Sequence, residues 1–134
     1  MDWKLEVVVV PVADVDRAKR FYGEQVGFVV DVDTQMSATF RVVQLTPPGS
    51  ACSITIGSGL SEMAPGSLKG LQLVVTDINA ARAELVARGV AVSEVQHFEQ
   101  GRAVAGHGGD FNAFLFFSDP DGNAWTVQER PRQG

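Results

Sequence analysis

The stretch that decides the fold is Val9–Arg20, which reads Val-Val-Pro-Val-Ala-Asp-Val-Asp-Arg-Ala-Lys-Arg. β-Branched residues come first, Asp14 follows as a helix N-cap, and a helical pattern begins directly after it. The same order returns at Gln72–Ala83, where Asp77 lies 63 residues after Asp14. The chain has 134 residues, so this offset is close to half of its length. The repeat predicts an internal duplication.

The rest of each half is strand-like. Each helical pattern ends just before a glycine, Gly27 or Gly89, which suits the left-handed position after a helix. Apolar runs separated by turn residues then follow at 29–32, 40–45 and 52–57 in the first half, and at 90–95, 113–117 and 124–128 in the second. The turn Ser118–Asn123, Ser-Asp-Pro-Asp-Gly-Asn, separates the last two runs. Each half therefore predicts a β-α-β-β-β module.

The predicted fold class is α+β, with both modules inside a single domain over 1–134. The first module covers 1–57, a linker rich in Gly, Ser and Pro covers 58–69, and the second module covers 70–130. One such module has a helix on only one face of its sheet, so its other face needs a cover. We expect the two mixed sheets to curve toward each other and to enclose a cavity between the halves.

Composition excludes several classes of function. Lys and Arg together number 11 and Asp and Glu 16, which gives a net charge of −5, so nucleic acid is not an expected partner. No apolar run is long enough to cross a bilayer, and no signal-peptide pattern opens the chain. The single cysteine, Cys52, has no partner for an internal disulfide. These features predict a cytoplasmic protein without membrane partners.

The segment Val9–Phe28 and the turn Ser118–Asn123 together resemble the vicinal oxygen chelate (VOC) superfamily. That superfamily contains glyoxalase I, extradiol dioxygenases, and fosfomycin- and bleomycin-resistance proteins. The resemblance covers essentially the whole chain and implies the glyoxalase/bleomycin-resistance fold. It implies less about function, because this fold carries many chemistries.

The resemblance also implies where a metal would bind. Metal-dependent members carry ligands at the positions that Val7, Gly70 and Thr126 hold in this chain. Valine and glycine offer no side-chain donor, and a neutral hydroxyl is a poor ligand. We therefore expect no metal and no cofactor, and none of the metal-dependent activities of the superfamily. A displaced metal site in the stretch 96–112, built on its two histidines, stays open as an alternative.

Strand alternation gives candidate ligand-binding residues, because side chains two positions apart face the same side of a sheet. Counted from the positions of the family ligands, and for the two phenylalanines from a resemblance to fosfomycin-resistance proteins, the set is Val9, Gln44, Gln72, Phe114, Phe116, Thr126 and Gln128. These side chains are apolar, aromatic or neutral amides, which suits a neutral, apolar or aromatic small molecule. Phe117 and Trp125 have the opposite parity and are expected in the core under the helices.

Two functions remain open from the sequence. The first is a metal-independent binding protein, similar to bleomycin-resistance proteins that sequester their ligand, and forming a homodimer. The second is a metal-independent isomerase, cyclase or lyase acting on a small carbonyl compound or natural product. It would use His97 or His107 as acid or base, both of which lie in the glycine-rich stretch 96–112. That stretch is either a lid over the cavity or an ordinary surface loop.

Overall fold

The computed structural model describes residues 1–132 and divides them into two compact units. The first unit comprises Met1–Leu68 together with the turn Asp119–Asn123. The second comprises Lys69–Ser118 and the chain from Ala124 onward. Each unit has its own sheet, one of four strands and one of five, so the predicted α+β class is confirmed.

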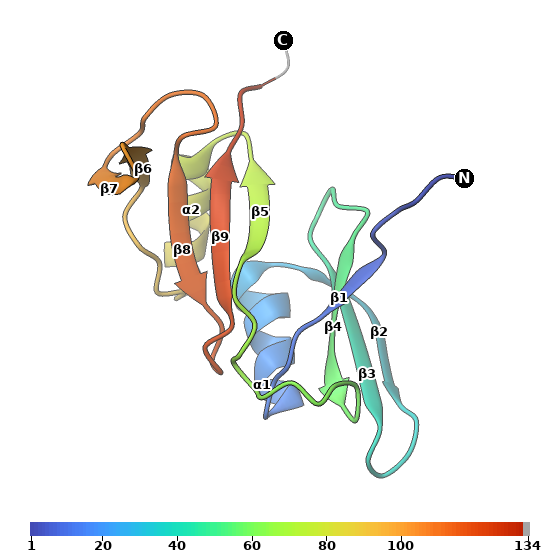
Figure 1. Cartoon of the computed structure of the whole chain (residues 1–134). Helices are drawn as coiled ribbons and strands as arrows, with labels where there is room; N and C mark the ends of the chain where they lie inside the picture. The colour runs from blue at the N-terminus through green and yellow to red at the C-terminus, as the bar shows by residue number, and fades with distance from the viewer. Residues whose placement is uncertain (133–134) are drawn as a thin grey trace. The chain divides into compact units, whose positions relative to one another are not determined.

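The first unit carries a mixed sheet in the order β1-β4-β3-β2 (Figure 1). Its strands are β1 (Val7–Val9), β2 (Val29–Gln35), β3 (Arg41–Thr46) and β4 (Ser53–Ser58). β1 pairs with β4 in parallel, and the other two pairs are antiparallel. A bulge between Val30 and Val32 places Asp31 out of the regular register of β2.

The helix of the first unit begins where the sequence predicts. The side chain of Asp14 accepts a hydrogen bond from Arg17 N (3.1 Å) and caps α1 (Val15–Arg20). α1 continues as a π-helix, η1 (Phe21–Val26), which ends at Gly27 with φ of 94°. Ala18, Phe21 and Tyr22 from these helices are buried, as are alternate side chains of the sheet: Val43, Leu45, Ile54 and Ile56.

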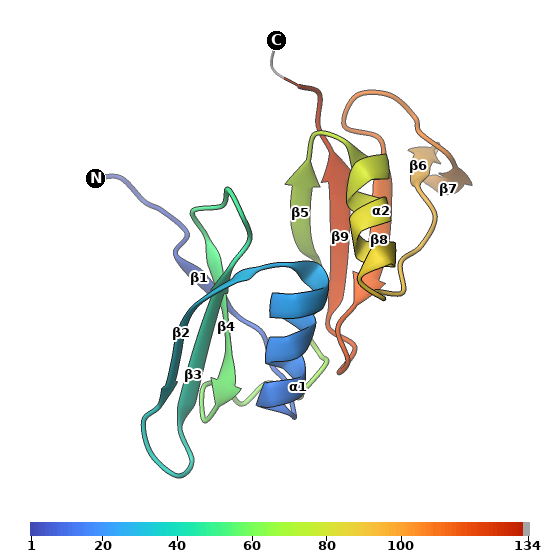
Figure 2. The ribbon, with the colours of Figure 1, turned by 180° about the vertical axis from the view of Figure 1, so that it is seen from behind.

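The second unit carries a sheet in the order β5-β9-β8-β6-β7. Asp77 caps α2 (Ile78–Ala87), and the views from the two sides show α2 across one face of β8 and β9 (Figures 1 and 2). Phe117 and Trp125 are buried with their rings stacked at 5.9 Å, as expected for the core. The strands are β5 (Leu71–Val75), β6 (Gln96–Glu99), β7 (Arg102–Ala105), β8 (Phe114–Ser118) and β9 (Ala124–Glu129). No helix within residues 1–132 has the length and hydrophobicity that a membrane crossing needs.

One predicted strand is wrong. Residues 90–95 form no strand. Ser93 ties this segment to β8, since its N donates to Phe116 O and its Oγ accepts from Phe116 N. The strands β6 and β7 instead form a hairpin inside the stretch that the sequence assigns to a loop. Its two-residue turn, Gln100-Gly101, has φ of 50° and 74°. Such turns favour Asn-Gly or Asp-Gly, so Gln-Gly gave little signal.

Candidate functional site

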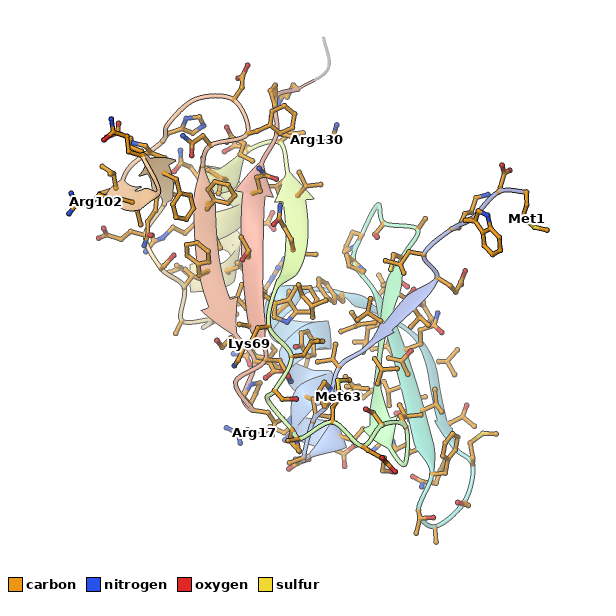
Figure 3. The ribbon with its side chains drawn as sticks, in the orientation of Figure 1. Met1, Arg17, Met63, Lys69, Arg102 and Arg130 are labelled. Atoms are coloured by element: carbon orange, nitrogen blue, oxygen red, sulfur yellow. The ribbon has the colours of Figure 1, made fainter. Side chains whose placement is uncertain are left out.

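Five of the predicted ligand-binding residues lie together on the face of the second sheet that α2 does not cover. Phe114 is opposite Gln128, Phe116 is opposite Thr126, and Thr126 is also opposite Gln72. Figure 3 looks onto this face, with the side chains of β5, β9 and β8 standing on it. We call it the helix-free face of the second sheet. The same parity adds Val74 and Ala124, so the strand positions on this face carry no charged side chain.

Aromatic rings dominate one side of this face. Phe114 and Phe116 are half-buried, so part of each ring is open to a ligand. Phe98 of β6 is 42% exposed, and its ring meets that of Phe114 edge to face at 5.3 Å. The sequence did not identify Phe98 as a candidate, because the strand that carries it was expected at 90–95 instead.

A directed pair of amides crosses the other side of the face. Gln128 Nε2 donates to the carbonyl of Phe111 (2.8 Å), and Gln72 Nε2 donates to Gln128 Oε1 (2.8 Å). A carbonyl can only accept, so Phe111 fixes which way the Gln128 amide points, and Gln128 in turn fixes Gln72. Within the described residues, Gln72 Oε1 is left as a hydrogen-bond acceptor, on a face whose strand positions carry no charge.

The first sheet has a helix-free face of its own. Val9 and Gln44 both lie opposite Thr55 on it, so the structure brings these two predicted residues together in the first unit. Val9 also lines a hollow of about 200 Å³ together with Gly57 and Met63.

A polar chain runs along this first face. Gln44 Nε2 donates to Ser53 Oγ (3.4 Å), Ser53 Oγ lies 2.6 Å from Thr46 Oγ1, and Thr46 donates to the carboxylate of Asp31. The carboxylate of Asp31 can only accept, so all the hydrogen bonds of this series point toward it. Alternation within 52–57 could have found Ser53, whereas Asp31 is reached only through the bulge in β2.

Both nitrogens of His97 are engaged within its own hairpin and loop. Nδ1 lies 2.8 Å from the carbonyl oxygen of Gly106 and therefore donates, and Nε2 lies 3.1 Å from Glu99 Oε1. The residue is only 8% exposed. The Gly106 carbonyl, and then the Glu99 carboxylate, raise the pKa of His97 above its usual value. A side chain at Gly108 would meet His97, since a Cβ there would lie 2.5 Å from His97 Cβ.

His107 is also bonded at both ring nitrogens. Its Nδ1 accepts from Gly109 N (3.0 Å), so its Nε2 carries the proton and donates to Glu129 Oε1. The other oxygen of Glu129 accepts from Ile78 N (2.9 Å) at the start of α2. The bonds from His107 and then from Ile78 lower the pKa of Glu129. The two predicted acid–base residues thus brace the segment between β6 and β8.

The positions where the family resemblance implies metal ligands do not fit a metal ion. Val7 and Gly70 have no donor, and Thr126 offers one neutral hydroxyl. Gly70 has φ of 90°, which side chains rarely adopt, so a ligand residue there would also be strained. Among residues 1–132, no three His, Cys, Asp or Glu side chains come close enough together to hold a metal ion.

Comparison with known proteins gives a consistent family. The profile of the Glyoxalase/Bleomycin resistance protein/Dioxygenase superfamily matches residues 4–127. No protein with a curated description matches the chain. TnmS3, an antibiotic binding protein from Streptomyces sp. CB03234, is 33% identical, with a TM-score of 0.77 over 96% of this chain and 97% of its own.

Two further solved structures agree. A glyoxalase/bleomycin resistance protein from the same Streptomyces strain is 34% identical, with a TM-score of 0.73 over 93% of this chain and 99% of its own. A superfamily member from Sphaerobacter thermophilus DSM 20745 is 27% identical, with a TM-score of 0.75 over 96% of this chain and 98% of its own. The chain belongs to the Glyoxalase/Bleomycin resistance protein/Dioxygenase (VOC) superfamily.

Proposed function

We propose that the protein binds a neutral, apolar or aromatic small molecule on the helix-free face of its second sheet, without a metal ion. The observation that carries the proposal is the composition of that face. Two half-buried phenylalanines, Phe114 and Phe116, stand beside the ordered amides of Gln72 and Gln128, and no strand position on the face is charged. Stacking and a few hydrogen bonds suit such a ligand better than ion pairing does.

These groups support the proposed chemical class of the ligand. An exposed charge on the ligand would find no opposite charge among the strand positions of this face, whereas a flat ring would contact Phe114 and Phe116. A hydroxyl or amide N–H on the ligand would bond to Gln72 Oε1. Thr126 completes the contacts proposed for the second unit. In the first unit, Val9 and Gln44 stay proposed contacts on the helix-free face of their own sheet.

The similarity to TnmS3 supports this class, because TnmS3 is an antibiotic binding protein and is 33% identical to this chain. The histidines favour binding over turnover. His97 and His107 use both ring nitrogens in contacts within the chain, so neither has a free lone pair aimed at a ligand. A general base needs such a lone pair within hydrogen-bond reach of the proton it removes.

A dye titration tests the proposal. Nile red, a neutral aromatic dye, is expected to bind saturably, and anilinonaphthalene sulfonate, an anionic one, to bind far more weakly. Phe116→Ala should weaken Nile red binding by roughly tenfold, which corresponds to about 1.4 kcal/mol. Val86→Ala on α2, where the side chain is 51% exposed, is the matched control and should leave the Kd unchanged. Equal weakening by both variants, or no saturable binding, would overturn the proposal.

Metal independence has its own measurement. Protein purified without chelators should contain no stoichiometric iron, manganese, nickel or zinc, and EDTA should leave the Nile red Kd unchanged. A metal at one equivalent whose removal abolishes binding would contradict this part of the proposal.

The proposed assembly is a homodimer. Trp3 and Leu5 are 88% and 71% exposed, and such large exposed apolar side chains near the chain start favour contact with a second copy. Sedimentation equilibrium should give twice the chain mass of 14.4 kDa. A monomer at every concentration tested would contradict it.

A further inference from the structure

Phe111 has a backbone conformation that its side chain does not favour. Its φ is 57°, and the only other non-glycine residue with positive φ in the described chain is Gln100. Gln100 lies in a two-residue hairpin turn, where positive φ is required. Phe111 lies in the turn Gly109–Asn112, closed by Asn112 N donating to Gly109 O (3.1 Å). At this third position of a turn with positive φ, glycine or asparagine is preferred.

The surrounding bonds hold this strained turn in place. Gly108 N donates to Asn112 O (2.9 Å), and Gln128 Nε2 donates to Phe111 O (2.8 Å). The Asn112 side chain bonds the backbone of Phe98 in both directions, accepting from its N (2.9 Å) and donating to its O (3.0 Å). The turn is therefore anchored to β6 and to β9.

The ring of Phe111 gains little from this arrangement inside the chain. The residue is 57% exposed, so burial of its ring does not offset the cost of the positive φ. Glycine is close at hand in this segment, at positions 106, 108 and 109, yet position 111 is phenylalanine. Strain that is held by neighbouring bonds and not repaid by packing is typical of residues that contact ligands.

The turn is attached directly to the helix-free face of the second sheet. Gln128, which holds the Phe111 carbonyl, lies opposite Phe114 in the pairing of β8 with β9. An exposed aromatic residue is therefore fixed at the end of a face that already carries Phe114 and Phe116.

We infer that Phe111 is a further ligand-binding residue, which the strained turn presents to an aromatic ligand on this face. The inference rests on the proposed function. The contact is made by the ring, whereas the carbonyl of the same residue orients the Gln128–Gln72 amides. These two roles can be separated, because substitution of the side chain leaves the carbonyl in place.

The test compares variants that relieve the strain with one that keeps the ring. Phe111→Gly and Phe111→Asn remove the ring and suit a positive φ, so their Tm should equal or exceed that of the parent. Their Nile red Kd should rise roughly three- to tenfold, as expected for the loss of one aromatic contact. Phe111→Tyr keeps the ring and should leave the Kd within twofold of the parent value, a change of less than about 0.5 kcal/mol.

The outcomes separate this inference from the proposed function. An unchanged Kd in Phe111→Gly, with Phe116→Ala still weakened, would overturn the role of Phe111 and leave the proposed function standing. A lower Tm in both the Gly and Asn variants would overturn the strain on which the inference depends. If the parent chain shows no saturable Nile red binding, both the inference and the proposed function are wrong.

Discussion

The hydroxyl of Tyr22 donates to Asp119 Oδ2 over 2.7 Å, and both residues are buried, at 0% and 5% exposure. The same oxygen accepts from Asn123 Nδ2 (2.7 Å), whose amide also donates to the carbonyl of Pro11 (2.8 Å). The other oxygen, Oδ1, accepts from three backbone N–H groups, those of Asp121, Gly122 and Asn123. One buried carboxylate therefore organises the turn that the sequence singled out as a family signature.

Tyr22→Phe should lower the free energy of unfolding by about 1–3 kcal/mol, because it removes a buried hydrogen bond to a charged group. Thermal unfolding followed by circular dichroism measures the change as a fall in Tm of several degrees. Asp119→Asn is the informative companion, since an amide cannot accept from donors on both sides. It should cost more than Tyr22→Phe, and an equal or smaller cost would contradict this account of the turn.

The ion pairs of Asp33 predict a dependence of stability on pH. Arg41, first, and Lys19 donate to the Asp33 carboxylate at 2.7–3.0 Å and hold the pKa of that carboxyl well below its usual range. Because the pKa of Asp33 is lower in the folded chain than in the unfolded chain, its ionisation stabilises the fold at pH values above the unfolded pKa of about 3.9. The stabilisation is therefore present at neutral pH and is lost as the pH falls through the acid range.

Urea unfolding at a series of pH values checks this. Asp33→Asn should be less stable than the parent at pH 7, and the difference should shrink toward pH 2. Asp2→Asn is the matched control, because the Asp2 side chain is 95% exposed and reaches Lys4 only at 4.0 Å. If the difference in free energy of unfolding between Asp33→Asn and the parent stays constant with pH, the ion pairs of Asp33 do not contribute through its ionisation.

The acceptor left on Gln72 predicts a ligand preference. With 7-hydroxycoumarin and 7-methoxycoumarin as a matched pair, compared at a pH where the phenol is protonated, the parent should bind the hydroxyl compound roughly three- to tenfold more tightly. Gln72→Met keeps the length of the side chain and removes the acceptor, so the two affinities should become equal. A preference that survives in Gln72→Met would assign the hydrogen bond to another residue.

The sequence predicts this fold well where periodicity and capping agree. Asp14 and Asp77 were expected as N-caps because each stands between a β-branched run and a helical pattern, and both cap a helix. Parity put Phe117 and Trp125 in the core, where they are buried, whereas Phe114 and Phe116 were placed on the opposite face by the family resemblance. These features are local, so they leave a pattern in the sequence.

The rest depended on contacts that leave no such pattern. The turn Gln100-Gly101 lacks the usual hairpin residues, so β6 was misplaced and Phe98 was not found. The positive φ of Phe111 is not predicted by the identities of its neighbours in the sequence. Asp31 joins the polar chain of the first sheet through a bulge, and a bulge changes the parity on which strand counting relies.

The two histidines give a prediction that NMR can read directly. The Gly106 carbonyl and the Glu99 carboxylate raise the pKa of His97, so its imidazole should titrate above the usual value of about 6.5. The stabilisation that goes with this shift is fully present below the unfolded pKa and is lost as the pH rises through the folded one. Glu99→Gln should bring the pKa measured for His97 back toward the usual value. His107→Gln assigns the His97 resonances, because the chain has 2 histidines. Ring protons of His97 that titrate at or below the usual value would mean that the bonds to Gly106 and Glu99 do not persist in solution.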